Sequence, residues 1–283
     1  MNETLRCETM PEENFAPAPL PDSPRVIYRR NPLVGVVCQF RFPPILKIAS
    51  EVPVTFQERL RSRYPLLAEK YSSINMELPQ GIPATIANTI KNVFPQPRAI
   101  GYDFISADEK SRITLTRDFL SLSSSNYTRW EDFREHLEEP FNALLDIYKP
   151  PFFSRIGLQY QNLIRPSQLE LPSTTKWSEL LKPHIAGMLG PPDVADFIEQ
   201  YFTQTLIKFP DSRGQVQINF GFVEIANSRE KAFLINNDFY IGGRTGVGDV
   251  NRVINYFNRQ SGNLFRWCIQ ERLHTAMEPH LVG

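Results

Sequence analysis

Residues 155–165 read RIGLQYQNLIR and decide the fold class of this chain. Apolar and polar side chains alternate along the stretch, and successive side chains of a β-strand point to opposite faces of a sheet. One face of the predicted strand carries Ile156, Leu158, Tyr160, Asn162 and Ile164, and the other carries Arg155, Gly157, Gln159 and Gln161. The pattern therefore predicts a strand with one largely apolar face.

The residues before this strand predict another strand, a helix and a group of short strands. Residues 33–42 are rich in Val and Phe and stop at Pro43, as a strand does where proline removes the next ladder donor. A short helix should begin in the turn that holds Pro53 and end near Pro65. Three short strands are expected at residues 100–106, 112–116 and 119–123.

The clearest amphipathic helix is predicted at residues 130–148, where large apolar side chains recur at helical spacing. Thr128 and Glu131 have the spacing of a capping box at its start. Pro140 lies inside the helix and should kink or split it, because proline removes one backbone hydrogen bond and crowds the preceding turn.

The residues after the 155–165 strand predict two more helices, two strands and a long C-terminal helix. The helices are expected at residues 177–186 and 193–207, and the strands at residues 215–225 and 232–235. A glycine-rich segment follows, and the last helix should begin at an Asp249 cap and run toward Met277. Gly262 is a candidate point of interruption.

Groups of short strands followed by long helices predict an α+β fold, in which antiparallel sheets are covered by long helices. The order of elements suggests two pseudo-repeated halves at residues 25–150 and 151–283, with one continuous domain as the alternative. Residues 1–24 hold five prolines among Ala, Glu and Asp, and we expect a disordered tail there. A proline-rich docking peptide at PAPLP is the other interpretation of that tail.

The composition narrows the class of protein. Lys plus Arg and Asp plus Glu are 31 each, so nucleic-acid binding would need a local patch, and we interpret the basic residues 25–30 as a solvated hinge. Cys7, Cys38 and Cys268 lack the spacing of a disulfide framework or a zinc site. Because the sequence shows no signal peptide and no membrane-length apolar run, we expect a cytoplasmic protein with no membrane partner.

Several segments hold residue types that serve chemistry, but none has the spacing of a catalytic motif. Residues 242–248, GGRTGVG, lie between a predicted strand and a helix as a phosphate-binding loop does. They lack the Gly-Lys-Ser or Gly-Lys-Thr ending, which favours a flexible loop. The glutamates between residues 131 and 139 favour a solvated acidic face over a cation site, and the serines at 121–125 lack a nucleophile elbow. We expect no catalytic residue, metal or cofactor.

Three segments carry a resemblance to a known family. They are NPLVGVVCQFRFPP from Asn31, LSLSSSNYTRWEDF from Leu120 followed by RIGLQYQNLIRP from Arg155, and LFRWCIQERL from Leu264. Together they resemble a sporadically distributed family of bacterial and archaeal proteins of similar length, known mainly as uncharacterised. The Arg-Ile-Gly-Leu-x-Tyr-x-Asn strand is the most specific part. The resemblance implies a prokaryotic protein and no particular activity, and the patchy distribution suits mobile or defence-associated genes.

Two functions fit these observations. The first is a non-enzymatic interaction or regulatory protein that binds another protein or itself, such as the partner of a toxin or defence effector. The alternative is a small-ligand or nucleotide sensor, in which a cleft between the halves is lined by Arg155, Tyr160, Asn162, Arg244 and Thr245. A concave pocket around these residues favours the sensor, whereas a flat aromatic patch with a hydrogen-bonded Asn162 favours the protein partner.

Overall fold

Strand β7 (Phe153–Ile164) forms over the residues for which the alternating pattern predicts a strand. It is an inner strand of a nine-stranded antiparallel sheet. The computed structural model describes residues 19–71, 99–172, 174–210, 214–225 and 228–281. Within these residues the strands cross the sheet in the order β3 (Leu66–Tyr71), β4 (Ala99–Ile105), β5 (Ser111–Thr116), β6 (Phe119–Ser124), β2 (Leu33–Arg41), β7, β10 (Lys231–Thr245), β9 (Gln215–Glu224) and β8 (Phe202–Lys208). This sheet, together with its helices, confirms the α+β class.

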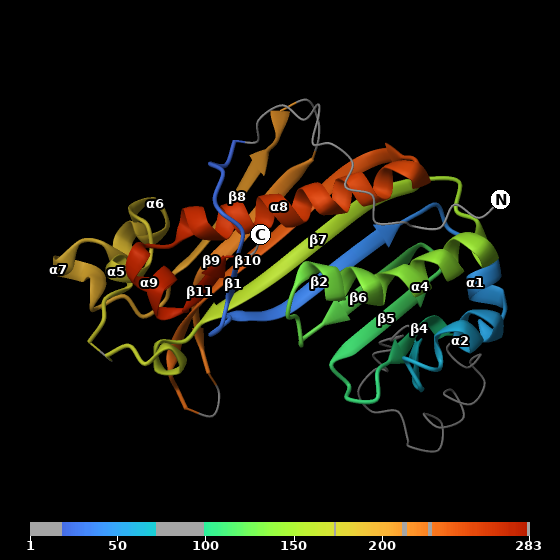
Figure 1. Ribbon diagram of the computed structural model, residues 1–283, viewed down its shortest axis with the longest axis horizontal. Helices are drawn as coiled ribbons and strands as arrows, with labels where there is room; N and C mark the ends of the chain where they lie inside the picture. The colour runs from blue at the N-terminus through green and yellow to red at the C-terminus, as the bar shows by residue number, and fades with distance from the viewer. Residues whose placement is uncertain (1–18, 72–98, 173, 211–213, 226–227, 282–283) are drawn as a thin grey trace, which may run out of the picture.

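Two long helices cover one face of the sheet (Figure 1). The α-helices within the described residues are α1 (Leu46–Ser50), α2 (Val54–Leu60), α4 (Trp130–Tyr148), α5 (Trp177–Leu180), α6 (Pro183–Ala186), α7 (Pro192–Ala195), α8 (Val250–Cys268) and α9 (Glu271–Ala276), of which α4 and α8 are the two long ones. Helices α4 and α8 lie across what we call the covered face, where Ile156, Leu158 and Ile164 of β7 are fully buried. The opposite face, which we call the polar face, carries Arg155 and Gln159.

The strand order runs outward in both directions from the adjacent β2–β7 pair. Strands β6, β5, β4 and β3 continue outward from β2, and β10, β9 and β8 continue outward from β7. The two halves of the chain thus contribute to a single sheet, joined where β2 and β7 pair from Leu33 to Arg41. The duplication of the halves stays a prediction.

Helix α4 begins without the predicted capping box. Its N-cap residue is Arg129, which makes no side-chain capping hydrogen bond, and the Thr128 hydroxyl donates to the Asp132 carboxylate instead. The helix also runs unbroken through Pro140, so the predicted split does not occur. An interior proline costs about 3 kcal/mol, but each large apolar side chain buried along the helix contributes about 1.5–3 kcal/mol. Packing therefore outweighs the lost hydrogen bond.

The segment between residues 177 and 208 departs most from the prediction. The first expected helix is divided into α5 and α6, because residues that precede a proline such as Pro183 avoid the helical region. The prediction of a second helix at residues 193–207 is wrong. Only Pro192–Ala195 are helical, and Phe202–Lys208 form the edge strand β8, in which Thr, Ile and Phe favour extended backbone and β9 supplies the hydrogen bonds.

The C-terminal helix is shorter than the sequence predicts. Helix α8 follows Asp249 as expected and continues through Gly262, but it ends at Cys268 and is followed by the separate helix α9. Between them Ile269 is extended, fully buried and paired with Leu181 through an isolated β-bridge. This contact with Leu181 ends helix α8, and helical periodicity in the sequence cannot predict it.

The ordered chain begins before residue 25, where the sequence placed its start. Leu20 is buried in the core, and Ser23 hydrogen-bonds to Asn263 of α8. Strand β1 (Val26–Tyr28) then pairs with β11 (Pro279–Leu281), which brings the two ends of the described chain together (Figure 1). Residues 1–18, the rest of the predicted tail, lie outside the described residues.

Among the helices in the described ranges, none combines the length and the apolar character that a membrane crossing requires.

Candidate functional site

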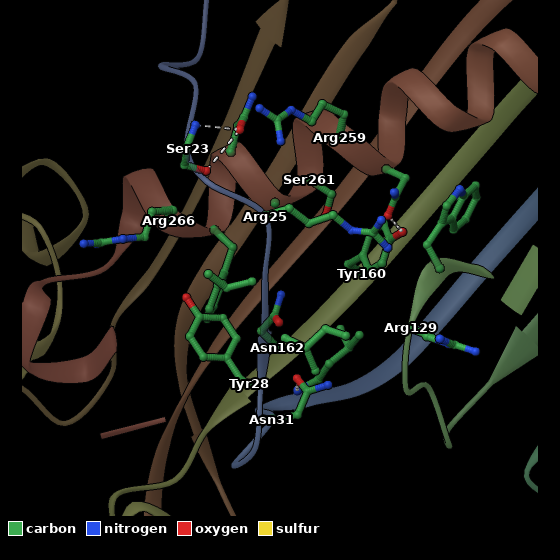
Figure 2. Close-up of a pocket in the computed structure, with 18 of the residues that line it drawn as sticks. Ser23, Arg25, Tyr28, Asn31, Arg129, Tyr160, Asn162, Arg259, Ser261 and Arg266 are labelled. Atoms are coloured by element: carbon green, nitrogen blue, oxygen red, sulfur yellow. Dashed lines mark hydrogen bonds between the residues drawn. The ribbon is translucent and has the colours of Figure 1, made fainter. Parts of the chain in front are cut away.

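A cavity of about 380 Å³ lies on the covered face, between the sheet, α8 and the N-terminal segment (Figure 2). Its walls come from residues 23–33, from residues 127–130 at the start of α4, from β7, and from residues 258–266 of α8. Ligand pockets commonly measure roughly 300–1,000 Å³. The cavity therefore has the size of a site for a small molecule.

Local periodicity explains which side chains reach this cavity. The alternation of β7 directs Tyr160 and Asn162 to the covered face, between the buried Leu158 and Ile164. On α8, Asn258, Ser261 and Phe265 are spaced by three and four residues, so they share one side of the helix. The strand and the helix thus present polar groups to the same space.

Asn162 is the most informative residue of the site. Its side chain is 6% exposed and lines the cavity, yet it makes no hydrogen bond to any other residue of the described chain. Figure 2 shows it at the cavity wall between Tyr28 and Tyr160. Buried polar side chains nearly always have a partner. Asn162 therefore offers a free donor and a free acceptor to whatever enters the cavity.

Tyr160 holds the neighbouring part of the wall. Its hydroxyl donates to Oδ1 of Asn258 at 2.9 Å, and its ring makes an edge contact with Tyr127, with centroids 5.9 Å apart. Burial raises the pKa of Tyr160 well above its usual 10.0, although the positive charge of Arg25 acts in the opposite direction. Tyr160 is therefore a neutral donor that fixes the Asn258 amide.

A second buried amide beside the site also lacks partners. Asn237 of β10 pairs with Tyr160 across the ladder and lies on the same covered face. It is fully buried, and neither its Oδ1 nor its Nδ2 has a hydrogen-bond partner in the part of the chain that the structure describes. A fold selected for stability alone would place apolar side chains at such positions, because an unpaired buried polar group costs about 1–3 kcal/mol.

Three side-chain contacts hold residues 23–28 over the cavity. Oδ1 of Asn263 accepts hydrogen bonds from the Ser23 amide and hydroxyl, each at 3.1 Å. Arg25 contacts both carboxylate oxygens of Glu131, at 2.6 and 2.8 Å. The Tyr28 hydroxyl lies 2.8 Å from Nδ1 of His274 on α9. Residues 23–28 therefore form one wall of the cavity.

The structure brings together only two of the five residues that the sequence placed in a cleft. Tyr160 and Asn162 line the cavity, whereas Arg155 lies on the polar face and bonds to Asp238 at 2.7 Å. Arg244 lies at the far end of β10, over the ring of Phe152. Thr245 pairs with Phe153 beyond a register shift and is buried.

Sequence reasoning missed the contribution of α8. Asn258, Ser261 and Asn263 interrupt the apolar stripe of this helix, and Ser261 and Asn263 are 6% and 1% exposed. Polar residues at positions where an amphipathic pattern expects apolar ones are a detectable signal. Arg25 and Tyr28 lie in the basic segment 25–30, which the sequence analysis interprets as a solvated hinge and which the structure places at the cavity.

The other segments singled out in the sequence have structural roles. Gly242 and Gly243 belong to β10 rather than to a loop. Glu131 and Glu135 pair with Arg25 and Arg63, and the described residues contain no group of three His, Cys, Asp or Glu side chains that could hold a metal ion. Residues 121–124 are part of β6.

The Arg155–Asp238 pair on the polar face predicts a pH-dependent stability. Burial raises the pKa of Asp238 above its usual 3.8, and the charge of Arg155 opposes that rise. The stability from this group is complete below about pH 3.8 and is lost as the pH rises through the higher folded-state pKa. Arg155→Met should raise that pKa further and cost about 1–3 kcal/mol near neutral pH.

Urea unfolding between pH 4 and 7 measures this effect. We expect the deficit of Arg155→Met, relative to the unmodified protein, to grow with pH. In an Asp238→Asn background the same substitution should show no such growth. A deficit of equal size at every pH would instead mean that Arg155 acts through packing on Tyr240, whose ring centroid lies 4.6 Å from its guanidinium.

A scan against protein-family models and a search of curated proteins both find no match to this chain.

Proposed function

We propose that this chain is a non-enzymatic sensor that binds a small molecule in the cavity beside Asn162. The observation that carries the proposal is the Asn162 amide, which is 6% exposed, lines the cavity and lacks a partner among the described residues. A ligand can accept a hydrogen bond from this amide and donate one to it without displacing a partner among the described residues. The cavity encloses Tyr160 and Asn162, two of the five residues for which the sequence analysis predicted a concave pocket, and this supports the sensor.

The chemistry of the lining supports binding rather than catalysis. Within the described residues the lining consists of arginines, asparagines, hydroxyl-bearing side chains and apolar groups. It holds no carboxylate, histidine, lysine or cysteine, which are the usual general acids, general bases and nucleophiles. A serine nucleophile also needs an adjacent base.

The wall formed by residues 23–28 supports a sensing role. This segment is held by side-chain contacts to α8, α4 and α9, and many of its residues line the cavity. A ligand that contacts residues 23–28 adds to these side-chain contacts and therefore favours the position in which the segment covers the cavity. Occupancy of the cavity is thereby coupled to the part of the chain that leads into the N-terminal residues.

A protein partner is the second candidate, supported by exposed apolar side chains around the edge strand β8. Phe197 is 83% exposed, Phe202 72% and Met188 59%, and large exposed apolar groups mark interaction surfaces when they gather. Under this second candidate, we propose that the partner is a toxin or a defence effector. We also propose that the protein is cytoplasmic and is related to the prokaryotic family that its sequence resembles.

The test compares the small molecules that purified protein releases on denaturation. The unmodified protein is expected to release one compound in near-stoichiometric amount, and Asn162→Leu should release about tenfold less or lower. Gln161→Leu, which changes the neighbouring amide of β7, should behave like the unmodified protein.

The unfolding free energy of Asn162→Leu excludes a purely structural explanation. Because the substitution removes an unpaired polar group, the ligand-free variant should be as stable as the ligand-free protein or up to about 1 kcal/mol more stable. A marked loss of stability would mean that Asn162 satisfies the fold itself. A stoichiometric protein partner with no released compound would favour the second candidate.

A further inference from the structure

The cavity lining is rich in hydrogen-bond donors. It includes four arginines, Arg25, Arg129, Arg259 and Arg266, and in the described chain it includes no Asp or Glu. Each guanidinium presents only donors, whereas an amide or a hydroxyl presents both donor and acceptor. A ligand that complements such a lining must carry an excess of acceptors, as an anionic group does.

Two of the arginines are placed to meet that anionic group, although Arg25 already pairs with Glu131 through its Nη2. In Figure 2, Arg25 and Arg259 lie over the centre and the upper rim of the cavity, whereas Arg129 and Arg266 extend away from it. Arg259 has only a loose ion pair, 3.5 Å from Asp22, whose side chain is 82% exposed. Exposed ion pairs of this kind contribute little to stability. Oδ1 of Asp22 also accepts a hydrogen bond from Nδ2 of Asn263 at 3.0 Å, so an anionic ligand that takes the place of Asp22 would meet both Arg259 and Asn263.

The aromatic side chains of the lining suit a planar ring. Trp130, Tyr160 and Phe265 are at most 7% exposed, but the rings of Tyr28 and Tyr127 are only half-buried and line the same space. Aromatic faces of this kind stack on planar heterocycles such as the bases of nucleotides.

The free amide of Asn162 adds recognition of the ring edge. An asparagine amide offers a donor and an acceptor side by side, and this pair matches the donor and acceptor on the edge of a nucleobase. The amide has no hydrogen-bond partner among the described residues, so both of its groups are available to a ligand. Neither a simple anion nor an aliphatic acid uses them in this way.

We infer that the ligand of the cavity is a nucleoside monophosphate, with its phosphate at Arg259 and Arg25 and its base against Tyr28 or Tyr127 and the Asn162 amide. The inference rests on the proposed function, because it names the ligand class of the same site. The cavity of about 380 Å³ lies at the small end of ligand pockets, which suits a mononucleotide rather than a dinucleotide.

Titration calorimetry on the full chain, freed of any carried compound, tests this inference with the four common ribonucleoside monophosphates, their nucleosides and inorganic phosphate. At least one monophosphate should bind, and its nucleoside and inorganic phosphate should each bind about tenfold more weakly or worse. Arg259→Gln should weaken the monophosphate about tenfold and leave the nucleoside unchanged. Asn162→Leu should weaken both.

Arg244→Gln is the control variant, because Arg244 is an exposed arginine that lies over Phe152, away from the cavity. It should bind the monophosphate like the unmodified protein. Inorganic phosphate bound as tightly as the monophosphate would overturn the inference, since the ring would then contribute nothing. If no monophosphate binds but the protein still releases another compound that Asn162→Leu lacks, the ligand class is wrong and the proposed function stands. If no compound is bound at all, both fail.

Discussion

Replacing Phe153 by alanine is expected to destabilise the protein by about 3–5 kcal/mol. Phe153 begins β7 and is fully buried, where its ring centroid lies 5.6 Å from that of Phe40 and 5.7 Å from that of Phe141. These rings join the central strands β2 and β7 to helix α4. Truncation opens a cavity at this junction and removes aromatic contacts that add about 0.5–1.5 kcal/mol each.

Chemical unfolding followed by tryptophan fluorescence measures this loss. Because a domain is typically stable by only about 5–15 kcal/mol, the variant should unfold at a clearly lower denaturant concentration. Phe197→Ala is the matched control, since Phe197 is 83% exposed and its removal should change stability by no more than about 0.5 kcal/mol. Equal shifts for the two variants would contradict the assignment of the Phe153 ring to the core.

Gly221→Ala is expected to destabilise the protein by about 2–3 kcal/mol, although it adds a single methyl group. Gly221 lies in β9 opposite Phe202 of β8. A Cβ atom at this position would lie 2.1 Å from the carbonyl oxygen of Tyr201 and 2.9 Å from Cα of Phe202, which are both backbone atoms. Backbone cannot rotate aside as a flexible side chain can, so β8 must shift away from β9.

Gly262→Ala is the control for this prediction, because it is the same substitution in an open environment. A Cβ atom at residue 262 of α8 meets nothing within 4 Å. Alanine is a better helix former than glycine by about 0.8–1.0 kcal/mol, so this variant should be more stable than the unmodified protein. Loss of stability in both variants would show that the close approach of β8 and β9 is not the cause.

Strong local patterns predicted much of the fold, and tertiary contacts decided the rest. The alternation in residues 155–165 identified β7, and helical spacing identified α4. The error at residues 193–207 arose because β8 is an edge strand whose state depends on pairing with β9. In the same way, the end of α8 depends on a bridge between Ile269 and Leu181 that joins distant parts of the chain.

In the candidate site too, local sequence pattern predicted some of the residues and tertiary contacts decided the others. The alternation of β7 already assigned Tyr160 and Asn162 to one face and Arg155 to the other, but the three were grouped because they share a sequence signature. The structure follows the alternation. The contribution of Arg25 was not predictable, because it depends on how the N-terminal segment crosses the sheet and meets Glu131.

A crystal structure of the full chain together with the small molecule that it carries tests the central claim most directly. The account predicts that the molecule lies in the cavity between β7, α8 and residues 23–28, with one of its polar atoms about 2.7–3.2 Å from the Asn162 amide. A molecule bound on the polar face or along β8, with only water beside Asn162, would contradict it.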